Sequence, residues 1–191
     1  MKIVIVGTSD IAHALANLCQ EHDVKIVGRP EYNLTDKNAC DRLVRDYDHY
    51  DCVVLTQGTQ TNDLWNSFTV NATSTIYLIS EFYKNMHNGQ IIAVSSATVN
   101  WQSWPGIELN RLVYATAKTA LSDFCKHMNR KNIPGEEEKD VSIQVYEPNN
   151  FVSQMNANSK QDIQPVAQEL FSLVNNRRIS VLQGLNRSVQ L

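Results

Sequence analysis

The chain has 191 residues, of which 42% are hydrophobic and 19% charged, and its formal net charge is −3. We expect one globular domain over residues 1–191, because a chain of this length can bury a single core. The mixing of both charge signs argues against a nucleic-acid partner, and the first apolar run, residues 3–6, is too short for a signal peptide or a membrane span.

The four cysteines, Cys19, Cys40, Cys52 and Cys125, have no spacing typical of a metal site, and neither do the five histidines. We therefore expect no metal. The cysteines are interpreted as reduced, buried thiols of a cytoplasmic protein.

Short apolar runs alternate along the chain with amphipathic helical patterns. Strands are predicted at residues 2–6, 24–28, 51–56, 89–96, 141–146 and 179–184. Helices are predicted at residues 11–20, 35–47, 63–86, 109–129 and 165–175, with Thr35 and Asn62 as N-caps. Since no helix fits after the second strand, a very short extra strand is expected at residues 32–34.

The predicted strands are continuously apolar, which indicates a parallel sheet covered on both faces. The predicted fold class is therefore α/β, a Rossmann-like doubly wound parallel sheet in three α/β/α layers. Small or polar residues follow five of the strands: Gly7, Arg29, Thr56-Gln57-Gly58, Ser95-Ser96 and Glu147-Pro148-Asn149. Because ligands bind beyond the carboxyl ends of such strands, these residues predict a cofactor crevice.

Tyr114 and Lys118 lie four residues apart in a predicted helix, which places both side chains on one face. A nearby ammonium group favours the phenolate and lowers the pKa of a tyrosine from about 10. Such a tyrosine can give a proton to a substrate oxygen or take one from it.

In order along the chain, "GTSDIAHALA", "LTQG", "VNATS", "GQIIAVSS", "YATAKTAL" and "EPNNFVSQM" resemble the motifs of the short-chain dehydrogenase/reductase family. The resemblance covers residues 2 to about 155. It implies an oxidoreductase that transfers hydride between a nicotinamide cofactor and a small carbonyl or secondary alcohol substrate. A non-catalytic dinucleotide-binding or sensor protein of the same fold is the alternative.

The resemblance implies catalytic roles for four residues. Tyr114 would be the acid/base, and Lys118 would hold the nicotinamide ribose and depress the pKa of Tyr114. Ser96, with Ser95 as the alternative, would hydrogen-bond the substrate oxygen. Asn71 would place a water molecule that links Lys118 to solvent.

The resemblance also implies a set of cofactor-binding residues. Phe151 would offer backbone groups to the carboxamide, Ser153 would contact the cofactor, and Gly58 would let the backbone approach it. The whole set is Gly7, Thr8, Ser9, Ile11, Arg29, Asn33, Leu34, Thr56, Gln57, Gly58, Tyr114, Lys118, Pro148, Asn149, Phe151 and Ser153.

Arg29 follows the second predicted strand, where an acidic residue would accept hydrogen bonds from the ribose of NAD. A guanidinium group pairs instead with a 2′-phosphate, so we expect NADP(H), with NAD(H) as a second possibility. The paired helices at residues 63–86 and 109–129 imply, by the same resemblance, a homodimer or homotetramer.

Two stretches depart from the family pattern. The first turn has one glycine, with Asp10 and Ala12 near later glycine positions of the family. Asp10 would repel a pyrophosphate, unless it caps the helix instead. The stretch between Ser96 and Tyr114 is longer than usual, and its Trp101 and Trp104 either line a substrate pocket or pack the loop onto the body.

Overall fold

The computed structural model describes residues 1–97, 108–129, 139–149 and 162–188. At its centre lies a sheet with the strand order β2-β1-β3-β4-β5, in which every neighbouring pair is parallel. The strands are β1 (Lys2–Val6), β2 (Asp23–Val27), β3 (Cys52–Leu55), β4 (Asn88–Val94) and β5 (Asp140–Tyr146).

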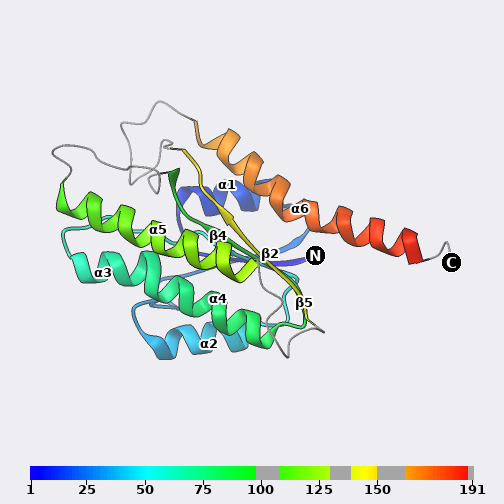
Figure 1. Cartoon of the computed structure of the whole chain (residues 1–191), viewed down its shortest axis with the longest axis horizontal. Helices are drawn as coiled ribbons and strands as arrows, with labels where there is room; N and C mark the ends of the chain where they lie inside the picture. The colour runs from blue at the N-terminus through cyan, green and yellow to red at the C-terminus, as the bar shows by residue number, and fades with distance from the viewer. Residues whose placement is uncertain (98–107, 130–138, 150–161, 189–191) are drawn as a thin grey trace.

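Helices cover both faces of the sheet (Figure 1). One face carries α1 (Asp10–Leu18) and α6 (Ile163–Ser188), and the other carries α2 (Lys37–Tyr47), α4 (Ser74–Asn85) and α5 (Leu109–Asn129). The short helix α3 (Leu64–Phe68) and the π-helix η1 (Thr69–Thr73) lead into α4. The predicted three-layer, doubly wound fold is confirmed.

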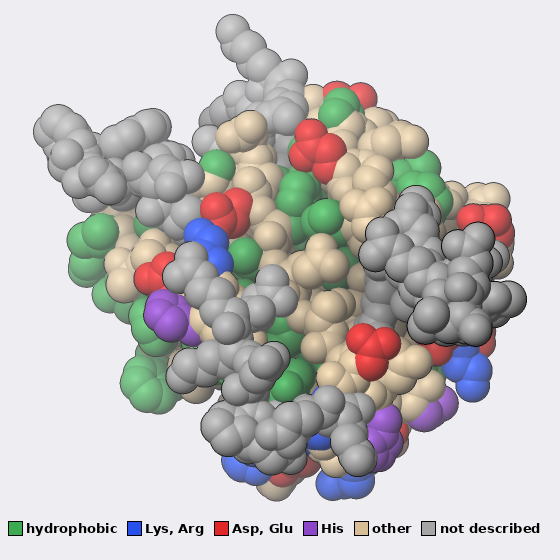
Figure 2. Space-filling view, turned by 45° about the vertical axis from the view of Figure 1, so that its right-hand side comes forward, with side chains coloured by type: hydrophobic (Ala, Val, Ile, Leu, Met, Phe, Trp, Pro, Cys, Tyr) green, Lys and Arg blue, Asp and Glu red, His purple; other side chains and the backbone are tan. Residues whose placement is uncertain are grey.

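Figure 2 shows one face of the molecule, on which acidic and basic side chains of the described residues are interspersed and do not gather by sign. In the part of the chain that the structure describes, every helix is too short or too polar to cross a membrane.

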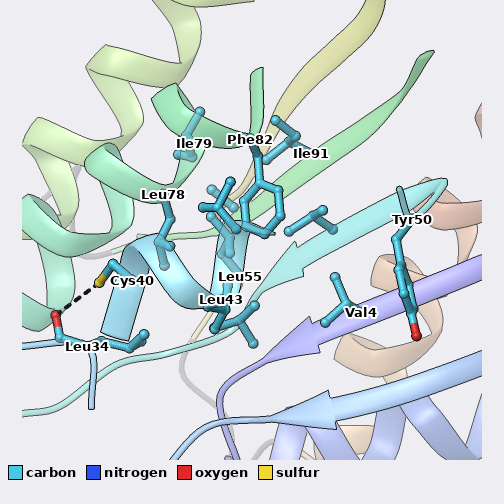
Figure 3. Packing of buried hydrophobic residues seen from close by; sticks show 14 of the residues in the cluster. Val4, Leu34, Cys40, Leu43, Tyr50, Leu55, Leu78, Ile79, Phe82 and Ile91 are labelled. Atoms are coloured by element: carbon cyan, nitrogen blue, oxygen red, sulfur yellow. Dashed lines mark hydrogen bonds between the residues drawn. The ribbon is translucent and has the colours of Figure 1, made fainter. Parts of the chain in front are cut away.

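Successive residues of β1 supply both hydrophobic cores. Ile3 and Ile5 pack under α1 and α6, whereas Val4 and Val6 face the other helices. Figure 3 shows the second core, in which Leu43, Leu78, Phe82 and Ile91 are fully buried. Burial of each such side chain stabilises the fold by about 1.5–3 kcal/mol. All four cysteines are buried thiols.

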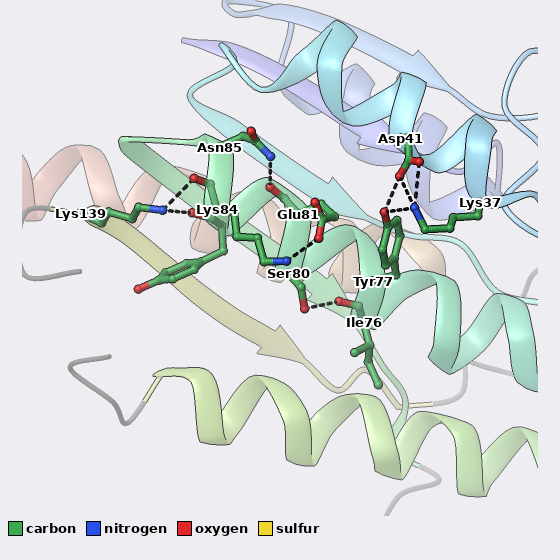
Figure 4. Close-up of polar contacts among 10 residues, drawn as sticks. Lys37, Asp41, Ile76, Tyr77, Ser80, Glu81, Lys84, Asn85 and Lys139 are labelled. Carbon is green, nitrogen blue, oxygen red and sulfur yellow. Dashed lines mark hydrogen bonds and ion pairs between the residues drawn. The ribbon is translucent and has the colours of Figure 1, made fainter. Parts of the chain in front are cut away.

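Polar contacts on the outer side join α2 to α4 (Figure 4). Lys37 Nζ donates to Asp41 Oδ2 at 2.9 Å and to the Tyr77 hydroxyl at 2.7 Å, and that hydroxyl donates to Asp41. Lys139 donates to the carbonyl oxygens of Tyr83 and Lys84 at the end of α4. These contacts link α2 to α4, and the end of α4 to the segment before β5.

Two of the predicted strands are wrong. Residues 32–34 form part of a turn, in which the N–H of Tyr32 donates to the Gly28 carbonyl and that of Asp36 to the Asn33 carbonyl. Residues 179–184 lie within α6. A short apolar run alone does not distinguish a strand from a buried turn or helix.

The topology predicts a ligand-binding crevice beside β1. From β1 the chain moves outward to β2, and it then returns to β3 on the other side of β1. Ligands of such sheets bind outside the carboxyl ends of the strands at this point of reversal, here the ends of β1 and β3.

Candidate active site

The turn after β1 lies against the end of β3. Gly7 has φ +114°, and a Cβ atom there would lie 2.8 Å from Thr56 Oγ1 and 2.9 Å from the Gln57 nitrogen. Only glycine fits both this backbone conformation and this close approach. The two strand ends therefore meet at the predicted crevice.

At the start of α1, the N-cap residue is Ser9, and the helix begins at Asp10. Ser9, and not Asp10, therefore holds the N-cap position that the sequence offered to Asp10 as an alternative. Its carboxylate lies in the first turn, where the helix dipole favours negative charge. Ser9 Oγ donates a hydrogen bond to Thr56 Oγ1 at 3.4 Å and makes no cap hydrogen bond. The first backbone N–H groups of α1 are therefore not capped by the Ser9 side chain. Thr8 is exposed, whereas the Ile11 side chain packs in the core.

After β2, the loop of residues 28–36 carries three of the predicted cofactor contacts. Arg29 and Asn33 are exposed, and Leu34 is buried. The Leu34 carbonyl oxygen accepts hydrogen bonds from Ser74 Oγ and, at 3.6 Å, from Cys40 Sγ. The loop is thus attached to both α2 and α4.

After β3, Gln57 is buried and Gly58 is exposed. Gln57 Nε2 donates to Thr75 Oγ1 at 2.8 Å, and Thr75 Oγ1 in turn donates to the Val70 carbonyl. Gln57 Oε1 is buried without a hydrogen-bond partner among the described residues. The Gln57 side chain is therefore directed towards α4, where it contacts Thr75.

Beyond β4, the structure brings Ser96 and Tyr114 together through a side-chain hydrogen bond. The alternative, Ser95, faces elsewhere. Its hydroxyl donates to the Lys118 carbonyl at 2.9 Å and accepts a hydrogen bond from Ser122 at 2.8 Å. Of the two serines, Ser96 is thus the one that lies beside the Tyr114 hydroxyl.

Lys118 is buried, and its ammonium group binds the main chain. Nζ donates to the Val94 carbonyl at 2.9 Å and to the Gln57 carbonyl at 3.3 Å. It lies 5.9 Å from the centre of the Tyr114 ring. Burial lowers the pKa of Lys118 to about 8.

The expected lowering of the Tyr114 pKa is wrong for this structure. Burial raises the pKa of Tyr114 to about 12, and the hydrogen bond to Ser96 opposes only part of this rise. Desolvation of the phenolate dominates, because two carbonyl groups hold the Lys118 ammonium.

Asn71 lies in the π-helix, with its side chain buried against the loop after β3. Nδ2 donates to the Thr59 carbonyl at 2.5 Å and to the Ser67 carbonyl at 2.7 Å, and Oδ1 accepts from the Thr59 nitrogen. The Asn71 amide thus binds a carbonyl of its own helical segment and both main-chain groups of Thr59 in the loop. The role of Asn71 in a water relay stays a prediction.

Near the end of β5, Pro148 is buried and Asn149 exposed. The Pro148 carbonyl accepts a hydrogen bond from the Ala97 nitrogen at 2.9 Å, which holds this segment beside Ser96. Four residues singled out in the sequence lie outside the described residues: Trp101, Trp104, Phe151 and Ser153.

Sequence reasoning missed Ser74 and Thr75, which hold Leu34 and Gln57 at the edges of the crevice. The signal in the sequence was a run of small hydroxyl residues on the buried side of a helix. Within the described ranges, no group of three or more His, Cys, Asp or Glu side chains could hold a metal ion.

Comparisons with known proteins agree with the fold and show the family. The family described as short chain dehydrogenase (adh_short) matches residues 1–164. No curated protein sequence matches the chain. The structure of BdcA in complex with NADPH has a TM-score of 0.72 and 18% identity, over 91% of this chain and 86% of that one.

Two further solved structures are similar over nearly their whole length. A short chain dehydrogenase from Burkholderia cenocepacia J2315 in complex with NADP has a TM-score of 0.74 and 13% identity, over 98% of this chain and 94% of that one. The 3-alpha-hydroxysteroid dehydrogenase from Pseudomonas sp. B-0831 complexed with NADH has a TM-score of 0.70 and 18% identity, over 91% of this chain and 89% of that one. At these identities the likeness is one of fold.

Proposed function

The chain belongs to the short-chain dehydrogenase family, and on that premise we propose that it is an NADP(H)-dependent oxidoreductase. Its substrate would be a small carbonyl compound or a secondary alcohol. The observation that carries the proposal is the pairing of Tyr114 with Ser96 beside the crevice at the ends of β1 and β3.

The residues around the crevice fit a dinucleotide in most respects. Gly7 gives a tight turn with no room for a side chain, and Thr8 is exposed at the start of α1. Arg29 is exposed at the end of β2, where a guanidinium group can pair with a 2′-phosphate. Asp10 opposes the fit, because a carboxylate in the first turn of α1 repels phosphate groups. NADP-bound and NADPH-bound neighbours support the choice of cofactor, and NAD(H) stays the second candidate.

When bound, the nicotinamide supplies or accepts the hydride. Tyr114 holds the proton on its hydroxyl oxygen and gives it to the substrate oxygen during reduction. Ser96 donates a hydrogen bond to the same oxygen and orients it. Lys118 fixes the carbonyl groups of Val94 and Gln57, and so holds the ends of β4 and β3 around Tyr114.

One observation favours the second candidate, a non-catalytic dinucleotide-binding or sensor protein. The Lys118 ammonium donates to two main-chain carbonyls, which leaves one of its three N–H groups for a ribose. Turnover distinguishes the two candidates. A sensor binds the dinucleotide but reduces no carbonyl compound, and in a sensor Tyr114→Phe does not change the affinity for the dinucleotide.

We also propose a cellular location and an oligomeric state. A cytoplasmic location is supported by the four buried thiols, and a homodimer or homotetramer by apolar side chains exposed on α3 and α5.

Calorimetric titration with NADPH and with NADH tests the proposal. We expect micromolar binding of NADPH and weaker binding of NADH. Arg29→Ala should weaken only NADPH, by roughly tenfold, because it removes a charge-assisted contact. Arg45→Ala, an exposed arginine on α2, is the matched control and should leave both affinities unchanged. Absence of binding of either dinucleotide at millimolar concentration would refute the proposed function.

A further inference from the structure

One turn of α5 lies against the end of β4 at the candidate active site. Ser96 bonds the Tyr114 hydroxyl, and Lys118 Nζ donates to the Val94 carbonyl at 2.9 Å. Both contacts involve the far ends of α5 side chains, which can turn about their own bonds. They do not by themselves fix the main chain of α5 on β4.

A third contact joins the main chain of the same helical turn to β4. Ser95 Oγ donates to the Lys118 carbonyl at 2.9 Å, and Ser122 Oγ donates to Ser95 Oγ at 2.8 Å. Ser95 and Ser122 are 3% and 1% exposed, so bulk water does not replace either bond. Each hydroxyl has one proton to donate, and both protons are used in this chain of hydrogen bonds from α5 to β4 and back.

The use of Ser122 differs from that of other helical hydroxyl groups in this protein. A serine or threonine in a helix can donate to the carbonyl four residues earlier in the same helix. The residues that do so include Ser80, Thr116, Thr119 and Ser172. For Ser122 the corresponding carbonyl is that of Lys118, but this carbonyl accepts the Ser95 hydroxyl instead. The two serines thus link a helix to a strand where a bond within the helix was available.

From this geometry we infer that Ser95 and Ser122 are a pair of positioning residues for the Tyr114 hydroxyl; the inference rests on the proposed function. Ser95 directly precedes Ser96, and Lys118 follows Tyr114 by one helical turn, so the pair lies just behind the two residues that would meet the substrate oxygen. The contact between the two serines sets how far the main chain of α5 stands from the end of β4. That separation determines the distance from the Tyr114 hydroxyl to Ser96, and catalysis is sensitive to a misplacement of about 1 Å.

Ser95→Ala breaks the link between helix and strand without leaving a buried group unpaired, because the Ser122 hydroxyl can then bond the Lys118 carbonyl. We expect kcat for reduction to fall about tenfold, measured with the compound that the native protein reduces fastest in a panel of small aldehydes and ketones. The KM of that compound and the Kd of NADPH should stay within about twofold of the native values. The midpoint of urea denaturation should stay within about 0.5 M.

Ser122→Ala removes the donor behind Ser95 and keeps the bond from Ser95 to the Lys118 carbonyl, so kcat should fall less, by about threefold. The double variant should be no slower than Ser95→Ala alone, because both changes break one chain of hydrogen bonds. If Ser95→Ala is slow and Ser122→Ala has the native kcat, Ser95 touches the substrate itself and the inference is overturned.

A measurement without cofactor or substrate follows the Tyr114 hydroxyl directly. In protein labelled with ¹³C at the tyrosine Cζ atom, the NMR signal of Tyr114 is the one that Tyr114→Phe removes, and its position depends on the hydrogen bond of the phenol. We expect this signal to move in Ser95→Ala. Ser80→Ala, which removes a hydroxyl bonded within α4, is the control and should leave the signal and kcat unchanged.

A native kcat or an unmoved Tyr114 signal in Ser95→Ala overturns the inference and leaves the proposed function intact. An NADPH Kd raised about tenfold, or a urea midpoint lowered by about 1 M or more, also overturns it, because the serines would then hold the fold and not the hydroxyl. A native protein that binds neither dinucleotide, or that binds NADPH and reduces no compound in the panel, overturns the proposed function and this inference with it.

Discussion

Tyr114 carries its proton at neutral pH, because burial raises its pKa to about 12. Carbonyl reduction needs the phenol, which is the dominant form at every pH below that value. We expect kcat/KM for reduction, measured with a carbonyl compound found by screening, to stay flat between about pH 5 and about pH 7, below the pKa of about 8 of Lys118. Alcohol oxidation needs the phenolate, so its kcat/KM should rise about tenfold per pH unit over the same range.

Tyr114→Phe removes the proton donor and should lower kcat for reduction by about 10²–10⁴-fold without weakening NADPH binding. An oxidation rate that levels off by about pH 7 would show instead that Lys118 lowers the pKa of Tyr114, as the sequence suggested.

Gly7 is the residue at which the crevice tolerates least change. Gly7→Ala places a Cβ atom 2.8 Å from Thr56 Oγ1 on a backbone with φ +114°. We expect the free energy of unfolding in urea to fall by about 2–4 kcal/mol. Gly28→Ala is the matched control: its Cβ atom would meet a methyl group of Thr8 at 3.2 Å, and a loss of less than about 1 kcal/mol is expected. Equal losses in the two variants would contradict this account.

At the residue scale, the sequence predicted that certain residues lie together better than it predicted what each of them contacts. Tyr114 and Ser96 meet as expected, because a helix face and a strand end fix their positions. The partners of Lys118 were not predictable, since they are main-chain carbonyls, and every residue carries one. The pKa of Tyr114 depends on burial, which a spacing of four residues does not reveal.

At the element scale, the π-helix η1 depends on the buried amide of Asn71. Asn71→Ala leaves both main-chain groups of Thr59 without this partner, so we expect a loss of about 1–3 kcal/mol in the free energy of unfolding. Asn85→Ala is the control, because Asn85 Nδ2 also donates to a carbonyl four residues earlier but is exposed. Its loss should stay below about 0.5 kcal/mol, and the pair can be compared by urea denaturation.

Element types were more predictable than element limits. The helix predicted at residues 109–129 matches α5 (Leu109–Asn129), whereas the N-caps of α2 and α3 are Asp36 and Asp63, each one residue after the expected position. Both aspartates accept the hydrogen bond that defines a cap, and the neighbouring Thr35 and Asn62 are polar enough to suggest the same role. The interruption by the π-helix η1 has no periodic signal in the sequence.

At the scale of the whole molecule, α3 and α5 carry large apolar side chains that the described part of the chain leaves exposed. The exposed fractions of these residues are 83% for Trp65, 60% for Leu109, 47% for Leu112 and 37% for Phe68. We expect light scattering to show a mass at least twice the 21.6 kDa of one chain. Trp65→Glu should shift the protein towards one chain, because it puts a charge into this surface.

Gln168→Glu, at an exposed position on α6 on the opposite side of the sheet, is the control and should leave the mass unchanged. A native protein that already scatters as a single chain at micromolar concentration would rule out the proposed homodimer or homotetramer.

The burial of all four cysteines makes the native protein a poor target for thiol reagents. Burial raises the pKa of Cys19 and Cys40 to about 11, so little thiolate is present even if a reagent approaches. Modification by an aromatic disulfide reagent should therefore occur only in molecules in which the core on one or the other side of the sheet has transiently unfolded. Its rate reports how often the chain opens, with Cys19 and Cys52 marking the side of α1 and Cys40 and Cys125 marking the side of α2. Mass spectrometry of partly modified protein would thus reveal whether the two halves of the molecule come apart together or one before the other.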